Sequence, residues 1–298
     1  MIHGFTTRNW KSRAVRLPQE DSFHISNNGK IIAVADGVTL DCTNGKAVRK
    51  SLSGALDIAF HYPRPSHAKK AADLFTSEAV DYIHSYVSFK EEGKSRIKFD
   101  NMDRMFKATF SDINHLIKLE NGWKNINYAD IDYAHNYPAG CTGAVTIENS
   151  GKVLWGYLTD CGVAVVSPKG NLKAKTKDEG PGRMGNYGAE VDAVGGWGSL
   201  EGRTLTRKIF RNNPNEPRAC GILNGMPEAM YYLRIGVFEK NSEDYLLVYS
   251  DGVEEALFSG HEDISGETVD LLRQGNIAGL EKLCRKRVVS EGTLVIKR

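Results

Sequence analysis

Long hydrophobic runs and a strong net charge are both missing from this chain of 298 residues, and we expect no signal peptide at its start. Its longest apolar runs have the length of a β-strand, too short to span a membrane, and the first residues lack an apolar signal region. The chain has 39 lysine and arginine residues against 37 aspartate and glutamate residues. No strong field therefore favours nucleic acid or a membrane surface as a partner. We expect a cytoplasmic protein that binds neither.

Cysteine is also scarce. The five cysteines are odd in number and widely scattered, and neither they nor the eight histidines show the spacing of a zinc site. We interpret the cysteines as reduced thiols, as expected in the cytoplasm. A metal site in this chain would therefore be built from oxygen ligands.

Two apolar runs end in the same tripeptide, Asp-Gly-Val. One covers residues 31–38 and contains Asp36, and the other covers residues 245–253 and contains Asp251. Each is typical of a buried strand with a carboxylate at its C-terminal end, where the glycine lets another backbone approach. Either dipeptide alone is more often a simple turn, so their joint arrangement carries the argument.

Acidic residues lie next to four of the predicted strands, at the same edge. They are the pair Glu20 and Asp21, then Asp36, Asp160 and Asp251. Such a cluster repels itself unless cations neutralise it. Carboxylate oxygens are the ligands that hard divalent ions prefer, so the cluster predicts a metal site.

A predicted hairpin places two of these acids face to face. Asn28-Gly29 is a strong signal for a two-residue turn. In that register the numbers of paired residues sum to 57, so Asp21 lies opposite Asp36. Like charges that face each other across two strands destabilise a sheet, and a cation between them would reverse the effect.

Helices and hairpins alternate along the chain in an order that favours antiparallel sheets covered by helices. Helical spacing predicts helices near residues 44–59, 68–86, 102–117, 268–272 and 277–287, and a final strand covers residues 293–297. Residues 178–230 are rich in glycine, asparagine and proline and show no period. We expect an irregular insertion there, which is either a functional lid or a tolerated surface segment.

Five short motifs follow one another in a familiar order. They are Arg16-Leu17-Pro18-Gln19-Glu20-Asp21, Val34-Ala35-Asp36-Gly37, Gly140-Cys141-Thr142-Gly143-Ala144, Leu158-Thr159-Asp160, and Tyr249-Ser250-Asp251-Gly252-Val253-Glu254-Glu255. Together they resemble the metal-dependent serine/threonine protein phosphatases of type 2C, over residues 13–298. The resemblance implies one domain over residues 1–298. Its α+β fold would be a four-layer α-β-β-α sandwich of two antiparallel sheets flanked by helices.

The resemblance also implies roles for individual residues. Two Mn²⁺ or Mg²⁺ ions, with a weaker third, would lie at one edge of the sandwich. The implied metal ligands are Glu20, Asp21, Asp36, the carbonyl of Gly37, Asp160, Asp251 and Glu255. Arg16 would bind the substrate phosphate, a task that suits the guanidinium fork.

Three departures from the family pattern matter. Val38 stands where many relatives carry a histidine that is a candidate general acid. Glu291 replaces the usual aspartate before the last strand, and we expect it to ligate metal with its longer side chain. The usual Gly-Asp-Ser-Arg reads Thr159-Asp160-Cys161-Gly162 here and keeps only the acid.

These observations predict a hydrolase that removes phosphate from phosphoserine and phosphothreonine in proteins, through a water that bridges two metals. Its partners would be a phosphoprotein substrate and a cognate serine/threonine kinase. The alternative is a catalytically weak regulatory or binding module with the same fold, which Val38 and Glu291 favour. A two-metal nuclease is disfavoured, because no basic stretch interleaved with aromatic residues tracks a polynucleotide.

Overall fold

The computed structural model describes most of the chain and places its strands in two large sheets. The described residues are 1–14, 19–38, 64–92, 99–123, 131–135, 137–181, 187–196, 199–260, 263–288 and 291–298. The helix expected at residues 44–59 and the Arg16 side chain lie outside these ranges.

Both large sheets are antiparallel, and the described part of the chain gives each of them five strands. The first has the order β1-β12-β9-β6-β7, with bounds Ile2–Arg8, Glu291–Lys297, Tyr245–Tyr249, Gly162–Val166 and Leu172–Lys175. The second has the order β2-β3-β4-β5-β8, with bounds Ser22–Ile25, Ile31–Val38, Gly140–Asn149, Lys152–Leu158 and Leu233–Glu239. A further pair of short strands, β10 (Phe258–Ser259) and β11 (Asp263–Ile264), forms a separate ribbon.

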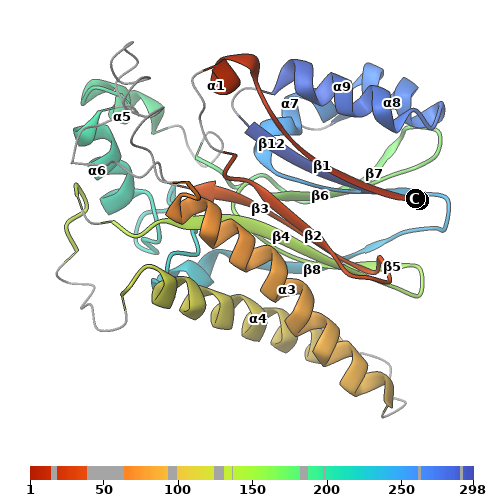
Figure 1. The fold of residues 1–298 in the computed structure, drawn as a ribbon, viewed down its shortest axis with the longest axis horizontal. Helices are drawn as coiled ribbons and strands as arrows, with labels where there is room; N and C mark the ends of the chain where they lie inside the picture. Colours follow the sequence, from red (N-terminus) through yellow and green to blue (C-terminus); the bar gives the residue numbers. More distant parts are fainter. Residues whose placement is uncertain are drawn as a thin grey trace.

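Helices cover the outer faces of both sheets (Figure 1). The long helices α3 (His67–Glu92) and α4 (Phe99–Glu120) lie on the second sheet, and α7 (Glu254–Leu257), α8 (Gly266–Arg273) and α9 (Ile277–Arg287) lie on the first. Shorter helices are α1 (Trp10–Ala14), α5 (Gly188–Ala193), α6 (Leu200–Ile209), and the 3₁₀ turns η3 (Pro227–Tyr232) and η4 (Asp251–Val253). The expected α-β-β-α sandwich is therefore confirmed.

Apolar side chains fill all three spaces between the layers. Phe75 on α3 and Phe110 on α4 meet edge to face at 5.2 Å beneath the second sheet. Branched residues such as Ile32 and Val248 are fully buried between the two sheets. Burial on both faces explains why these strands read as continuous apolar runs instead of alternating patterns.

Several elements differ in extent from those expected. Helix α3 runs six residues beyond Tyr86, and β12 begins at Glu291, two residues before the predicted strand. The segment 178–230 is not irregular throughout, because it contains α5 and α6 as well as η3. Tyr187 and Phe210 stack at 3.8 Å and bury the apolar side of these helices, which gives the insertion a small core of its own. Whether it acts as a lid stays a prediction.

Among the described residues, no helix is both long enough and apolar enough to cross a membrane.

Candidate metal centre

The hairpin of β2 and β3 brings Asp21 to Asp36, in the register that the sequence predicts. Ser22 pairs with Ala35, so Asp21, one residue before β2, lies opposite Asp36. The connecting loop is longer than expected, because Ser26 already bonds with Ile31 and four residues lie between them. The Asn28 side chain holds this loop, accepting hydrogen bonds from Ser26 Oγ and from the N–H of Lys30.

The other Asp-Gly pair brings Asp251 next to the start of β12. Asp251 opens η4 directly after β9, and β12 begins beside it with Glu291. A Cβ on Gly252 would overlap the carbonyl oxygen of Glu291. Glycine is required at this position, because only a residue without a side chain lets the two backbones lie this close. The close approach places both carboxylates at one edge of the sandwich.

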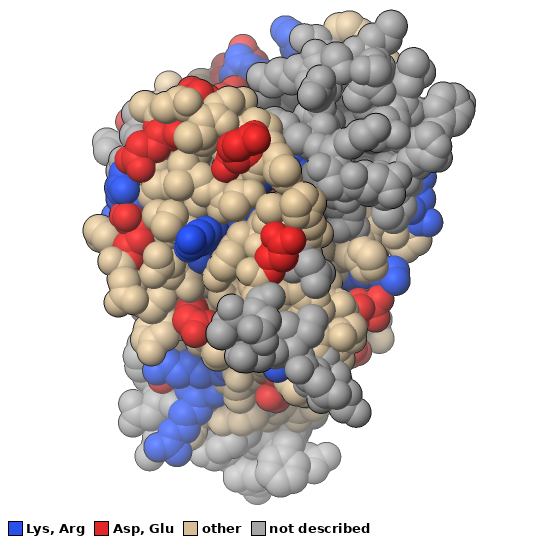
Figure 2. Space-filling view, turned by 90° about the vertical axis from the view of Figure 1, so that its left-hand side faces the viewer, with Lys and Arg blue, Asp and Glu red and all other residues tan. Residues whose placement is uncertain are grey.

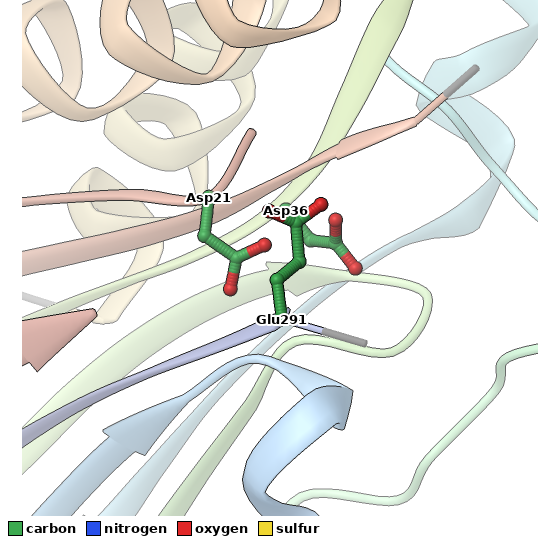
Figure 3. A group of neighbouring side chains, drawn as sticks. All are labelled: Asp21, Asp36 and Glu291. Atoms are coloured by element: carbon green, nitrogen blue, oxygen red, sulfur yellow. The ribbon is translucent and has the colours of Figure 1, made fainter. Parts of the chain in front are cut away.

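Among the described residues, five carboxylates meet at this edge, in two overlapping groups. Oxygens of Asp21, Asp36 and Glu291 lie within 4.8 Å of one another, and so do oxygens of Asp36, Asp160 and Asp251. Figure 3 shows the first group, with all three side chains pointing toward a common space. Asp36 belongs to both groups, which is the arrangement expected of a carboxylate that bridges two ions.

Hydroxyl groups fix the orientation of these carboxylates. Ser250 Oγ donates to Asp21 Oδ2 at 2.6 Å and itself accepts the N–H of Thr293 at 2.9 Å. Thr142 Oγ1 donates to Asp160 Oδ1, also at 2.6 Å. The Glu291 carboxylate accepts the backbone N–H of Glu20 at 2.6 Å. Hydrogen bonds of this kind orient metal ligands from behind.

Without a cation, the cluster resists ionisation. Burial is the largest cause and raises the pKa of Asp21 and Asp251 to about 6, of Asp160 to about 8 and of Glu291 to about 9. Burial also raises the pKa of Asp36 far above its usual value, and the charges of the other four carboxylates add to this effect. The metal-free edge therefore retains protons at neutral pH.

The donors that are present fit a divalent ion. Asp21 Oδ1 is buried and has no hydrogen-bond partner among the described residues. A buried carboxylate oxygen without a partner is costly, and an ion at this position would satisfy it. The ligand atoms of both groups are carboxylate oxygens, the set that Mg²⁺ and Mn²⁺ favour.

Two further predicted metal ligands are the Glu20 carboxylate and the carbonyl of Gly37. Glu20 is buried beside the edge, but its carboxylate accepts a hydrogen bond from Ser66 Oγ at 2.5 Å and belongs to neither group. Gly37 is buried opposite Cys141, and a Cβ there would come within 2.9 Å of the Glu20 carbonyl oxygen. Its own carbonyl as a ligand stays a prediction.

The structure does not bring Glu255 into the cluster. Glu255 is exposed on α7, whereas its neighbour Glu254 is buried and pairs with Lys175 at 2.5 Å. On a helix, adjacent residues point about 100° apart, so only one of the two can face inward.

Some residues of the site were not found from the sequence. Thr142 was given no chemical role, and Ser250 and Ser66 were not singled out. Thr142 pairs with Asp36 across β3 and β4, and no turn signal predicts that register, because the two strands lie far apart in the sequence. Asp178 was also missed; its charge adds to the raised pKa of Asp160 and Asp251. It lies in a stretch with no periodic pattern, so no local signal marks it.

Comparison with models of known protein families finds no match, and comparison with curated proteins finds none either. Solved structures do resemble the chain. The Mycobacterium tuberculosis serine/threonine phosphatase PstP/Ppp superposes with a TM-score of 0.58 and 15% identity, over 99% of this chain and 97% of that one.

Two further structures support the same likeness. The catalytic domain of the phosphatase PstP, in complex with two manganese ions, gives a TM-score of 0.54 at 15% identity, over 99% and 96% of the two chains. PppA, a regulatory component of T6SS in Pseudomonas aeruginosa, gives 0.56 at 13%, over 100% and 96%. The resemblance to the type 2C phosphatases is therefore confirmed over the whole chain at the level of the fold.

Proposed function

We propose that the chain is a metal-dependent phosphomonoester hydrolase that removes phosphate from phosphoserine and phosphothreonine in proteins. The observation that carries the proposal is the position of Asp36 in two carboxylate groups at once, one with Asp21 and Glu291 and the other with Asp160 and Asp251. Two Mn²⁺ or Mg²⁺ ions would be held there, with Asp36 between them. The manganese complex of the similar phosphatase PstP is consistent with this choice of ion.

The bound ions would supply a water of lowered pKa and would stabilise negative charge on the phosphoryl oxygens. The protein's part is to hold the carboxylates in place. Ser250 and Thr142 orient Asp21 and Asp160, and the narrow packing at Gly252 fixes the start of β12. We assign the binding of the substrate phosphate to Arg16, which lies outside the described residues, five positions before Asp21.

The partners we propose are a phosphoprotein and the serine/threonine kinase that modifies it. Figure 2 shows the end of the molecule that carries α5 and α6, where acidic and basic side chains are interspersed among uncharged ones on the described surface. Such a surface suits a polypeptide substrate better than a polynucleotide, whose backbone needs a continuous basic track.

Val38 has no proton to give a leaving group, although it follows Asp36-Gly37 directly. A reaction without a side-chain acid at this position depends more on how well the leaving group carries negative charge. We therefore expect aryl phosphates, whose phenolate leaving groups are stable, to be hydrolysed faster than phosphoserine peptides.

The test is phosphate release from p-nitrophenyl phosphate and from phosphoserine and phosphothreonine peptides, titrated with Mn²⁺ and Mg²⁺. We expect activity that a chelator abolishes and that added metal restores. Asp270→Asn, an exposed change on α8, is the matched control for charge loss. Metal binding without turnover would support the regulatory module, and neither binding nor turnover would overturn both functions.

A further inference from the structure

The residue before Asp160 has an unusual backbone conformation. Thr159 has a φ of 70°, in the left-handed region, and its side chain is buried. A β-branched residue is strongly disfavoured there. Glycine, which has no Cβ, adopts this conformation freely. In this chain, something must therefore hold Thr159 in a conformation that it does not prefer.

A hydrogen bond from the insertion holds it. Thr159 Oγ1 donates to the carbonyl oxygen of Gly221, and the Thr159 carbonyl accepts the N–H of Glu179 at 2.9 Å. Gly221 reaches Thr159 because it lacks a side chain, since a Cβ there would come within 2.7 Å of Leu158 Cδ2 and 2.5 Å of Tyr232 Cβ. The backbone of the insertion thus packs directly against the end of β5.

The same segment also holds the strand that carries Thr142. Leu223 and Cys141 exchange two backbone hydrogen bonds, of 3.0 and 2.9 Å. Thr142 follows Cys141 and donates to the Asp160 carboxylate. Residues 221–223 therefore bind the residue before Thr142 and the residue before Asp160, and so hold Asp160 from both sides.

We propose that Thr159 is a positioning residue. Its bond to Gly221 stabilises the left-handed turn, and this turn directs Asp160 toward Asp36 and Asp251. The insertion would thereby set the affinity for the ion that this second group holds. The inference rests on the proposed metal centre but not on its phosphatase activity.

Three substitutions at this position separate positioning from ordinary stability. Thr159→Val removes the hydroxyl and keeps the branched Cβ. The left-handed turn then loses its hydrogen bond to Gly221 but keeps the conformational strain of a β-branched residue. Thr159→Ser keeps the hydroxyl and therefore the hydrogen bond. Thr159→Gly removes both the hydrogen bond and the conformational strain. Thr268→Val is the matched control, because the buried Thr268 hydroxyl also donates to a carbonyl, that of Ala256 at 2.9 Å, beneath α8.

The measurement is calorimetric titration of the full chain with Mn²⁺, accompanied by thermal unfolding without metal. We expect Thr159→Val to weaken the weaker binding step by about tenfold or more, as changes behind metal ligands generally do. The serine and glycine variants should stay within about threefold of the original chain, and Thr268→Val should lower only the unfolding temperature.

Unchanged Mn²⁺ binding in Thr159→Val would overturn the proposal and leave the hydroxyl a purely structural group. Equal losses in the valine and glycine variants would also overturn it, because the conformation would then not matter. A chain that binds Mn²⁺ and hydrolyses no phosphomonoester would refute the proposed function alone. A chain that binds no Mn²⁺ would refute both.

Discussion

Carboxylates lie between the two sheets at both ends of β4, and the protein treats their charges differently. At the C-terminal end of β4, away from Thr142, Glu148 forms ion pairs with Lys240 at 3.0 Å and Lys297 at 2.5 Å. Although burial opposes it, the hydrogen bonds from these lysines hold the pKa of Glu148 below its usual value. At the Asp36 end, five carboxylates have raised pKa values instead.

The difference separates a carboxylate that the chain pairs with its own lysines from a group of carboxylates that repel one another. One end carries its own cations, so it is complete in the folded chain. The other end presents oxygens from both sheets to a space that a divalent ion fits. A cluster of acidic residues therefore indicates a metal site only when lysine and arginine side chains do not already neutralise it. Four predictions test this contrast, beginning with the largest effect.

Asp36→Asn should abolish hydrolysis while the fold is kept. The change removes the carboxylate that both groups share, and loss of ion-mediated stabilisation of several kcal/mol corresponds to about a thousandfold or more in rate. Without metal, the variant should melt above the original chain, because an amide is neutral at any pH whereas Asp36 must take up a proton to be buried beside the other carboxylates. Steady-state rates and melting curves with and without Mn²⁺ measure both effects. Near-normal turnover would refute the bridging role.

Glu148→Gln should lower the free energy of unfolding by about 2 kcal/mol, less than for a fully buried pair, because Glu148 is half-buried and only the buried Lys240 is left without its charged partner. Urea unfolding measures this, with Glu239→Gln as the control, because Glu239 pairs with Lys152 on the exposed surface. Mn²⁺ affinity should not change. A loss of Mn²⁺ affinity equal to that of Asp36→Asn would show that the two ends are not independent.

Glu291→Gln should weaken Mn²⁺ binding by about tenfold and raise the metal requirement for activity. The amide keeps the shape of the side chain and removes its charge. Glu291→Asp should be tolerated, because it keeps the carboxylate at the start of β12. Calorimetry distinguishes the two variants. If Mn²⁺ binding is the same in the original chain and in Glu291→Gln, then Glu291 is not a ligand.

The metal-free chain should become more stable as the pH falls from about 9 toward 5. The folded-state pKa of Glu291, about 9, and of Asp160, about 8, exceed the ordinary values of 4.5 and 3.8, so the folded state binds more protons. We expect a rise in melting temperature on the order of 3 °C. With Mn²⁺ bound, protons compete with the ion, and the trend should reverse. Parallel pH slopes with and without Mn²⁺ would contradict ligation by these groups.

Local sequence signals predicted the parts of the site that depend on strand geometry. The Asn28-Gly29 turn gave the pairing of Asp21 with Asp36, because register follows from turn position and side-chain alternation. The true loop is two residues longer at its base, yet the sum of paired positions is the same. The Asp-Gly pairs marked the strand ends for a similar reason, since glycine permits the close packing seen at Gly252.

Other parts of the site could not be read locally, because they depend on contacts between distant residues. Ser250 meets Asp21 across 229 positions, and no pattern around either residue shows this. The choice between Glu254 and Glu255 depends on the phase of a four-residue helix that is too short to show a period. Helices α5 and α6 were missed because glycine and polar residues dilute their apolar face, even though Ser199 caps α6 at the N–H of Gly202.

The site has a further consequence, because its carboxylates come from both sheets. Asp36 lies on β3 of the second sheet and Asp21 directly precedes β2 of the same sheet, while Glu291 lies on β12 of the first, 270 positions after Asp21 along the chain. An ion held by all three would connect the sheets as a reversible cross-link. It would suppress local opening at this edge and add stability that grows with the logarithm of the free ion concentration. Amide hydrogens at the start of β12 should then exchange slowly only with the ion bound, while those near Lys297 stay protected in either case.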